Sequence, residues 1–389
     1  MKLLTVIGTR PEAVKMVPIL RALATCADID SRLCVTGQHR DLLDQALGFF
    51  DLAPDIDLNL MAVDQSLNDF FGRAVVAIGR VLDEQQPDRV LVQGDTVSAL
   101  AGALAAFQRR IPVSHVEAGL RTFDTANPWP EEGYRQAIDA IADQLFAPTS
   151  AAAANIERAA GKSIAVTGNS GVDATYCVLG RLSRDRKLRQ AADAAIPAIA
   201  ADRPLLLATI HRRESFGEPL HRICAALARI AAARAHIILP VHPNPEVAGP
   251  IRSALGNRAG ITLLDPLPLP AMIRLMQRVD LVLTDSGGVQ EEAATLAKPA
   301  LILRTVTDRP ESVAAGLARL AGTETDAIIA VVEAELEHIR LQPLHGVSPN
   351  PFGDGRAAER IVAGLLGKPV QPFEAVRAEA PPVPIRLVG

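Results

Sequence analysis

Short apolar segments alternate with longer segments of helical period along the whole chain. In the first half we expect strands at residues 3–7, 33–36, 89–93, 113–116 and about 144–147, with helices such as 12–24, 67–84 and 97–107 between them. The predicted strands are almost entirely apolar, which is typical of parallel strands that helices cover on both faces. The pattern therefore predicts an α/β fold of parallel layers.

A second set of elements follows a change in composition. Residues 183–204 are rich in Arg, Asp and Ala and carry no strand pattern, which indicates a helix or connector between two lobes. Further strands are expected at residues 205–210, 236–241, 261–264, 281–284 and 300–303. The proline-containing stretch 372–389 has turn and extended composition and is expected along the surface. We infer two βα lobes of similar size.

Composition narrows the class of protein. A chain of 389 residues suggests two or three domains, and its formal charge of −4 gives no global positive field for nucleic acid or an anionic membrane. Aromatic residues amount to 3%, too few for the stacking platforms of a single-strand nucleic-acid binder. The four cysteines form no C-x-x-C pair, so zinc and disulfides are not indicated. No signal peptide or spanning segment is evident, and a cytoplasmic protein is expected.

Ligands of open α/β sheets bind at the carboxyl ends of the strands, so we expect the binding and catalytic residues to follow the strands. The first strand ends in Gly8-Thr9-Arg10-Pro11-Glu12, and Lys15 follows on the predicted helix. This turn can present N–H groups and cations to an anion, although a plain strand-to-helix turn with a solvated arginine explains it equally well. No G-x-G-x-x-G and no Walker A sequence is present, which argues against a nicotinamide or P-loop site.

Three acidic residues follow strands or open a helix in the first lobe. Asp95 follows the third strand and can alternatively be a helix N-cap, whereas Glu117 ends a buried strand, where an unpaired carboxylate is costly. Glu131 lies in the first turn of a helix and can simply offset the helix dipole. If the three converge with Arg121 and Arg135, they form an acid/base site.

The second lobe offers groups suited to a nucleoside diphosphate. Ser286-Gly287-Gly288 opens a helix after the fourth strand, where N–H donors at the positive helix end suit a pyrophosphate. Glu291 or Glu292 can hold a ribose diol or merely offset the dipole, and Arg304 and Arg309 add positive charge. His211 and His242 follow the first two strands of this lobe, and each can alternatively be a packed loop histidine.

These residues occur in motifs with a recognisable order and spacing. The motifs are GTRPEAVKM at 8–16, TGQHRDLLDQ at 36–45, QGDT at 93–96, HVEAGLRT at 115–122, PEE at 130–132, TGN at 167–169, HRRESFG at 211–217, PVHPNP at 240–245, TDSGGVQEE at 284–292, DRPES at 308–312 and NPFGDG at 350–355. Over about residues 1 to 365 the chain resembles the non-hydrolysing UDP-N-acetylglucosamine 2-epimerases.

The resemblance implies two Rossmann-like lobes of the glycosyltransferase-B type, with the active site in the cleft between them. The implied division is residues 1–180 for the first lobe, joined by a crossover helix at about 353–367, then 200–350 for the second lobe and 368–389 for a tail. It also implies a cytoplasmic homodimer without redox cofactor or metal. The reaction would convert UDP-N-acetylglucosamine reversibly to UDP-N-acetylmannosamine, a precursor of cell-envelope polysaccharides.

The resemblance also assigns roles to residues. In the family reaction UDP leaves C1 to give a 2-acetamidoglucal and adds back after protonation from the other face. The implied catalytic residues are Asp95, Glu117, Glu131 and His211. The implied substrate- and UDP-binding residues are Arg10, Lys15, Arg135, Met272, Ser286, Gly287, Gly288, Glu292 and Arg309. The implied allosteric candidates are Gln38, His39 and His242.

A few positions depart from the family pattern. Tyr134 replaces the usual Asn of the PEExNR motif and Phe123 follows Arg121-Thr122, so a related UDP-diacetamido sugar is an alternative substrate. Asp41 and Asp64 stand where the family uses other residues, which argues against allosteric control. The remaining alternatives are a hydrolysing 2-epimerase, a UDP-sugar glycosyltransferase and a catalytically silent nucleotide-sugar sensor.

Overall fold

Each of two compact units contains its own parallel sheet. The computed structural model describes residues 1–38, 40–62, 65–156, 162–198, 202–212, 215–341 and 350–375. The first unit consists of residues 1–197, 268–274 and 352–374, and the second of residues 198–267, 275–351 and 375–389.

The first unit is built on a seven-stranded parallel sheet. Its strands are β1 (Lys2–Ile7), β2 (Asp30–Val35), β3 (Ile56–Asp57), β4 (Arg89–Gln93), β5 (Val113–Val116), β6 (Gln144–Ala147) and β7 (Ser163–Val166). They lie in the order β3-β2-β1-β4-β5-β6-β7. The order reverses between β1 and β4, and such a switch point is where doubly wound sheets bind ligands.

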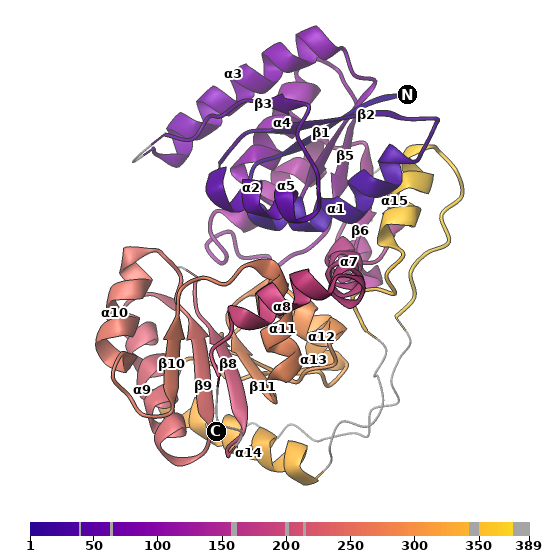
Figure 1. Cartoon of the computed structure of the whole chain (residues 1–389). Coiled ribbons are helices and arrows are strands. Elements are labelled where there is room, and N and C mark those ends of the chain that lie inside the picture. The colour runs from indigo at the N-terminus through magenta and orange to yellow at the C-terminus, as the bar shows by residue number, and fades with distance from the viewer. Residues whose placement is uncertain are drawn as a thin grey trace. The chain divides into compact units, whose positions relative to one another are not determined.

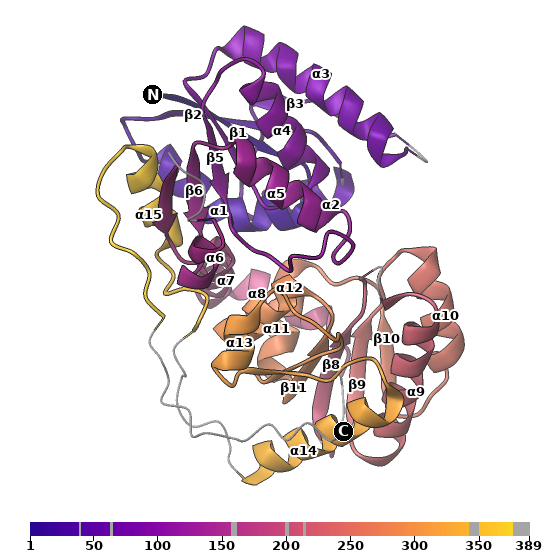
Figure 2. The same ribbon diagram turned by 180° about the vertical axis from the view of Figure 1, so that it is seen from behind.

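Alternation along the strands separates two apolar cores in this unit. In β1, Leu4 and Val6 face a cluster with helices α3 (Leu67–Gln85) and α4 (Val97–Phe107), as the two-residue period of a strand requires. Leu3 and Ile7 face the opposite cluster, which includes residues of α1 (Arg10–Ala24), α2 (Arg40–Phe49) and α15 (Ala357–Leu365). The remaining helices are α5 (Glu131–Ile141), α6 (Ser150–Ala154), α7 (Ser170–Arg184) and α8 (Arg186–Ala194). Figures 1 and 2 show helices on both faces of the sheet.

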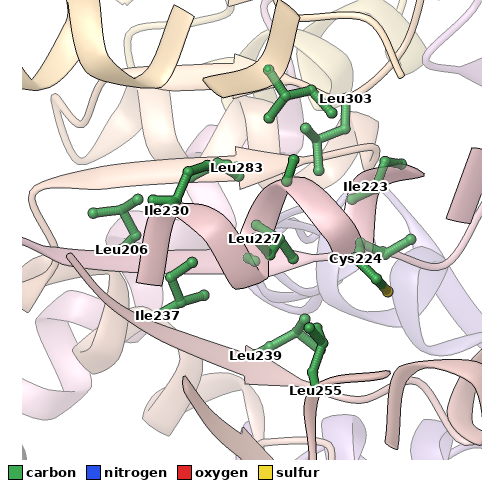
Figure 3. Close-up of a cluster of buried hydrophobic side chains, with 14 of the residues drawn as sticks. Leu206, Ile223, Cys224, Leu227, Ile230, Ile237, Leu239, Leu255, Leu283 and Leu303 are labelled. Atoms are coloured by element: carbon green, nitrogen blue, oxygen red, sulfur yellow. The ribbon is translucent and has the colours of Figure 1, made fainter. Parts of the chain in front are cut away.

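The second unit repeats the same topology with six parallel strands. They are β8 (Leu205–Thr209), β9 (His236–Pro240), β10 (Ile261–Leu264), β11 (Leu281–Thr284), β12 (Ala300–Ile302) and β13 (Ala318–Leu320), in the order β10-β9-β8-β11-β12-β13. The helices are α9 (Glu218–Ala233), α10 (Pro245–Leu255), α11 (Leu269–Arg278), α12 (Gly287–Thr295), α13 (Pro310–Ala314) and α14 (Thr325–Leu341). Figure 3 shows Ile223, Leu227 and Ile230 of α9 packed against strand residues such as Leu206 and Leu283.

The predicted α/β class with two parallel lobes is confirmed. Three short edge strands were not predicted: β3, β7 and β13. The units also divide the chain differently from the expected 200–350 lobe, because residues 268–274 group with the first unit. Arg274 of α11 donates its Nε to Asp193 Oδ1 of α8 at 2.8 Å, which ties this segment to the first unit.

The chain after residue 350 returns to the first unit. Ala358, Ile361 and Leu365 of α15 complete the apolar cluster around α1. Phe373, at the start of the expected 368–389 tail, is buried and donates its backbone N–H to Val166 O at 2.9 Å. The rest of that tail, from residue 376, lies outside the described residues. No helix in the described part of the chain is long and apolar enough to cross a membrane.

Candidate functional site

Glu117 lies directly after β5, at the carboxyl edge of the first sheet. Its Oε1 is 2.5 Å from Lys15 Nζ of α1, and its Oε2 accepts a hydrogen bond from the side-chain amide of Gln93 at the end of β4. Its backbone has a φ of 68°, in the left-handed region that a non-glycine residue rarely adopts. Such strain concentrates at functional sites, where it aims a side chain that ordinary backbone would not. The predicted need for a partner at Glu117 is met by Lys15 and Gln93.

Asp95 is held by an arginine of α5. Arg135 donates Nε and Nη2 to the same carboxylate oxygen, Oδ2, at 2.9 and 2.5 Å. The alternative that Asp95 caps a helix is wrong, because Thr96 is the N-cap of α4 and accepts from Ala99 N–H at 3.0 Å. The strands β4 and β5 pair in parallel, so the two candidate acids that follow them lie at the same carboxyl edge of the sheet. A Cβ added to Gly94 would lie 3.5 Å from Glu117 Oε2. Arg135 itself is 3% exposed.

The first turn of α5 carries two glutamates with different surroundings. Glu131 is half-buried at the first residue of the helix. Glu132 is fully buried and accepts the backbone N–H groups of Thr122 and Phe123 at 3.1 and 3.2 Å. Glu132 therefore fixes the loop that begins after Arg121. Phe123 on this loop is 73% exposed, with its backbone in the left-handed region.

Arg121 does not pair with the three candidate acids, contrary to expectation. Its Nη2 donates to Asp139 Oδ2 of α5 at 2.6 Å. The same carboxylate accepts Gly119 N–H at 3.0 Å and lies 2.6 Å from Nδ1 of His115 in β5. Burial by itself would raise the pKa of Asp139, but His115 and Arg121 outweigh that effect and hold this pKa below its usual value.

The turn after β1 is occupied by a side chain of its own helix. Glu12 is buried, and its Oε2 accepts from Gly8 N–H at 3.0 Å and from Thr9 N–H at 2.7 Å. These two N–H groups are therefore bonded within the chain, which favours the alternative of a plain strand-to-helix turn. Glu12 Oε1 accepts from Thr96 Oγ1 at 2.8 Å, next to Asp95. Burial raises the pKa of Glu12 to about 7, although these hydrogen bonds act in the opposite direction.

In the second unit a buried aspartate organises the loop after β8. Asp285 follows β11, is fully buried, and accepts the backbone N–H groups of His211 and Arg212 at 3.0 and 2.9 Å. It also accepts Ser215 Oγ at 2.9 Å and lies 3.3 Å from His211 Nδ1. A carboxylate close to Nδ1 orients the imidazole ring. His242 stacks on His211 with ring centroids 5.9 Å apart.

The start of α12 lies at the switch point of the second sheet. Ser286 is the N-cap and its Oγ accepts Val289 N–H, while Gly287 and Gly288 contribute the first N–H groups of the helix, which have no partner within it. A Cβ on Gly287 would lie 3.2 Å from the Arg309 guanidinium carbon, so Arg309 packs directly on the helix start. A cation beside a positive helix end is unfavourable by itself. Buried carboxylates offset it: Arg309 Nε donates to Glu291 Oε1 at 2.7 Å, and Nη1 is 2.7 Å from Asp308.

Four other predicted residues lie within the described part of the chain and one lies outside it. Arg10, Met272 and Glu292 are half-buried, and Met272 belongs to the segment that groups with the first unit. Gln38 accepts a hydrogen bond from Ser98 Oγ at 2.8 Å, whereas His39 is outside the described residues. Within the described ranges no group of three His, Cys, Asp or Glu side chains is arranged to hold a metal ion.

Sequence reasoning missed Glu12, Gln93, His115, Asp139 and Asp285 as members of these clusters. All five are buried polar residues within or beside the motifs, but their partners come from other strands and helices. The signal was their polarity inside strongly apolar surroundings, since a buried charge needs a partner.

Comparisons with known proteins find relatives over almost the whole chain. A family model described as UDP-N-acetylglucosamine 2-epimerase matches residues 21–366. The UDP-N-acetylglucosamine 2-epimerase of Escherichia coli (strain K12) is 44% identical over 369 residues, covering 94% of this chain and 98% of that protein. The enzyme of that name from Campylobacter jejuni is 41% identical, covering 94% of this chain and 97% of that protein.

Solved structures show the same fold. The UDP-GlcNAc 2-epimerase of Neisseria meningitidis bound to UDP-GlcNAc has a TM-score of 0.90 and 39% identity, over 95% of this chain and all of that chain. The enzyme of Methanocaldococcus jannaschii in complex with UDP-GlcNAc and UDP has a TM-score of 0.82 and 34% identity, over 94% and 100% of the two chains.

Two doubly wound parallel sheets, with paired carboxylates at the edge of one and a glycine-opened helix at the switch point of the other, define an α/β enzyme of the two-lobed, glycosyltransferase-B-like class. Within that class, the chain belongs to the UDP-N-acetylglucosamine 2-epimerase family.

Proposed function

We propose that this enzyme interconverts UDP-N-acetylglucosamine and UDP-N-acetylmannosamine by inverting C2 of the sugar, without hydrolysing the sugar nucleotide. The observation that carries the proposal is the pair of carboxylates at the first sheet, Glu117 on Lys15 and Asp95 on Arg135, in a chain that shares the fold of relatives solved with UDP-GlcNAc.

The chemistry explains why such residues are needed. The hydrogen on C2 is not next to a carbonyl, so its direct removal to a free carbanion has a prohibitive barrier. If UDP leaves C1 as a proton leaves C2, a 2-acetamidoglucal forms, and UDP returns after protonation from the opposite face. The reaction therefore needs acid/base groups on both faces of the ring and positive groups for the departing diphosphate.

We assign the proton transfers to Asp95, Glu117 and Glu131. Lys15 and Arg135 orient two of these carboxylates, because each pair is closely hydrogen bonded. Which acid serves which face stays open.

We assign the nucleotide to groups of both units. The α12 start at Ser286, Gly287 and Gly288, together with Arg309, would hold the diphosphate, and His211 would act on the leaving phosphate. Arg10 would add charge, Glu292 would hold the ribose and Met272 would pack on the uracil. Gln38, His39 and His242 remain candidates for an activating second substrate molecule.

We further propose a homodimer that works without redox cofactor or metal, in the cytoplasm. The dimer rests on the family resemblance and is tested by light scattering, which should give about twice the chain mass of 41.3 kDa. All four cysteines are free, which suits a reducing compartment.

The decisive experiment follows UDP-N-acetylglucosamine with the purified enzyme in heavy water by NMR. We expect deuterium at C2 and a mixture of gluco and manno UDP-sugars with little free UDP. Accumulating free N-acetylmannosamine would show a hydrolysing enzyme, consumption of the UDP-sugar with release of UDP only when an acceptor is added would show a transferase, and binding without turnover would show a sensor. Turnover of a diacetamido analogue in preference would show the modified substrate that Phe123 and Tyr134 suggest.

A residue-level test uses Glu117→Gln. We expect C2 exchange to fall at least a thousandfold while UDP affinity changes less than threefold, since Glu117 lies in the first unit and the diphosphate groups in the second. Glu246→Gln, an exposed glutamate in the first turn of α10, is the matched control and should exchange like the parent enzyme. Parent-like exchange in Glu117→Gln would remove Glu117 from the mechanism.

A further inference from the structure

His115 is a buried residue of β5 that makes two hydrogen bonds in opposite directions. Its ring is fully inaccessible to solvent. Nε2 is 2.7 Å from Gly94 O, and Nδ1 is 2.6 Å from Asp139 Oδ1. Both distances are those of good hydrogen bonds, so each contact must contain a proton.

The two acceptors decide where the protons are. A backbone carbonyl can only accept, so Nε2 carries a hydrogen. Asp139 already receives Gly119 N–H and forms an ion pair with Arg121 at 2.6 Å, so it is a carboxylate and accepts from Nδ1 as well. A neutral imidazole has one N–H and cannot supply both bonds.

The charges packed around the ring are compatible with this assignment. Asp139 is the carboxylate that His115 contacts, and Arg121 pairs with the other oxygen of that carboxylate. Lys162 bonds to the backbone carbonyls of Asp139 and Ala140 and is also in the field of Asp143. Burying an imidazolium is costly, and a direct ion pair with a buried carboxylate is the arrangement that offsets that cost.

The His115 ring lies between the segments that carry the proposed acids. Gly94 directly precedes Asp95, and Gly119 follows Glu117 by two residues. Through Asp139, both loops are joined to α5, whose first turns contain Glu131 and Arg135. One doubly protonated side chain thus connects the three segments that carry the proposed acids.

We propose that His115 is a positively charged positioning residue, protonated on both ring nitrogens, which fixes the loops of Asp95 and Glu117 relative to α5. The assignment of those two acids rests on the proposed function, whereas the protonation of His115 does not.

The first test is nitrogen NMR of the whole enzyme with 15N-labelled histidine at pH 7.5. The chain has eight histidines, and the His115 signals are assigned as those lost in His115→Gln or, if that variant does not fold, as those shifted in Asp139→Asn. We expect imidazolium shifts and an attached proton at both ring nitrogens. A single protonated nitrogen would overturn the proposal, whether or not the enzyme is an epimerase.

The second test separates charge from geometry with Asp139→Asn. The asparagine amide can donate to Nδ1 while its oxygen accepts from Gly119 and Arg121, so the ring should stay in place as the neutral Nε2–H tautomer. We expect kcat for C2 exchange to fall at least tenfold with KM and UDP affinity within threefold. An unchanged kcat alongside a neutral His115 would overturn the positioning role.

A matched control is His236→Gln in the second unit. The His236 ring bonds Thr262 Oγ1, away from the contacts of His115 with Gly94 and Asp139. It should leave kcat within twofold and the His115 signals unmoved. If the parent enzyme shows no C2 exchange at all, the proposed function fails while the NMR result for His115 is judged independently.

Discussion

Glu12 accepts hydrogen bonds from four donors in the folded chain, yet it is buried where a charge is poorly solvated. Gly8 N–H, Thr9 N–H, the Thr9 hydroxyl and the Thr96 hydroxyl all point at its carboxyl oxygens. Burial nevertheless raises its pKa to about 7. The residue therefore fills the turn that doubly wound folds often leave for a phosphate, and it does so with a carboxyl group that ionises near neutral pH.

The raised pKa of Glu12 predicts a pH dependence of stability. The folded chain keeps this proton at pH values where the unfolded chain has lost it, so the contribution to stability is complete below pH 4.5 and is lost as the pH rises through about 7. A shift of this size corresponds to about 3 kcal/mol. Between pH 4.5 and 8 the free energy of unfolding of the parent enzyme should therefore fall by about 3 kcal/mol more than that of Glu12→Gln, as measured by urea denaturation.

A second buried acid serves as the control for that titration. Burial raises the pKa of Asp173 to about 6, so it contributes in the same direction over a lower pH window. Asp173→Asn should remove its own part of the pH dependence and leave the part due to Glu12. Parallel pH profiles for Glu12→Gln and the parent enzyme would contradict the assignment.

The segment between β5 and α5 depends on one glycine. Gly119 has a φ of 83°, and a Cβ there would lie 2.1 Å from Ala152 O of α6. Its N–H bonds Asp139 and its carbonyl accepts Asn155 Nδ2 at 2.9 Å. The loop after Glu117 is thus fixed against both α5 and α6.

Replacing this glycine should move the whole loop. Gly119→Ala combines a steric clash with left-handed strain, and we expect the free energy of unfolding to fall by about 3 kcal/mol with loss of C2 exchange. Gly72→Ala in the exposed part of α3, where an added Cβ meets nothing, should instead gain about 1 kcal/mol. Equal stability of the two variants in thermal unfolding would contradict this account of the loop.

The predictability of the elements followed their burial. Strands buried along most of their length, such as Arg89–Gln93 and Leu281–Thr284, match the apolar segments read from the sequence. The edge strands β3 and β13 span two and three residues with exposed positions and leave no such segment. The hydrophobic periodicity of a sequence reflects burial, so it does not predict an edge strand that is short and partly exposed to solvent.

The candidate site was predictable in its residue types and less so in its pairs. Asp95 and Glu117 were identified because a charge at the end of a buried strand is costly without a partner, and Arg135 because it follows Glu131 and Glu132 by one helical turn. Arg121 was expected beside them, but its partner is Asp139, and Glu117 pairs with Lys15, 102 residues away in sequence. Such pairs depend on which strands are neighbours, which no local pattern reveals.

At the scale of the whole molecule, the two units should respond separately to substitution. Arg309→Lys keeps a positive charge but loses the fork held between Glu291 and Asp308, so UDP affinity should fall about tenfold. Glu117→Gln should leave that affinity nearly unchanged. Calorimetry with UDP on both variants checks the separation, and a comparable loss of affinity in both would show that Glu117 also contributes to nucleotide binding.

The return of α15 to the first unit affects synthesis on the ribosome. Ala358, Ile361 and Leu365 supply apolar surface that Leu3 and Ile19 require, yet they are translated long after those residues. Part of the apolar core of the nascent first unit therefore stays exposed while the second unit is translated and can fold. We expect ribosome-stalled chains lacking residues from 352 onward to be protease-resistant in the second unit and sensitive in the first, so that translation completes the earlier unit last.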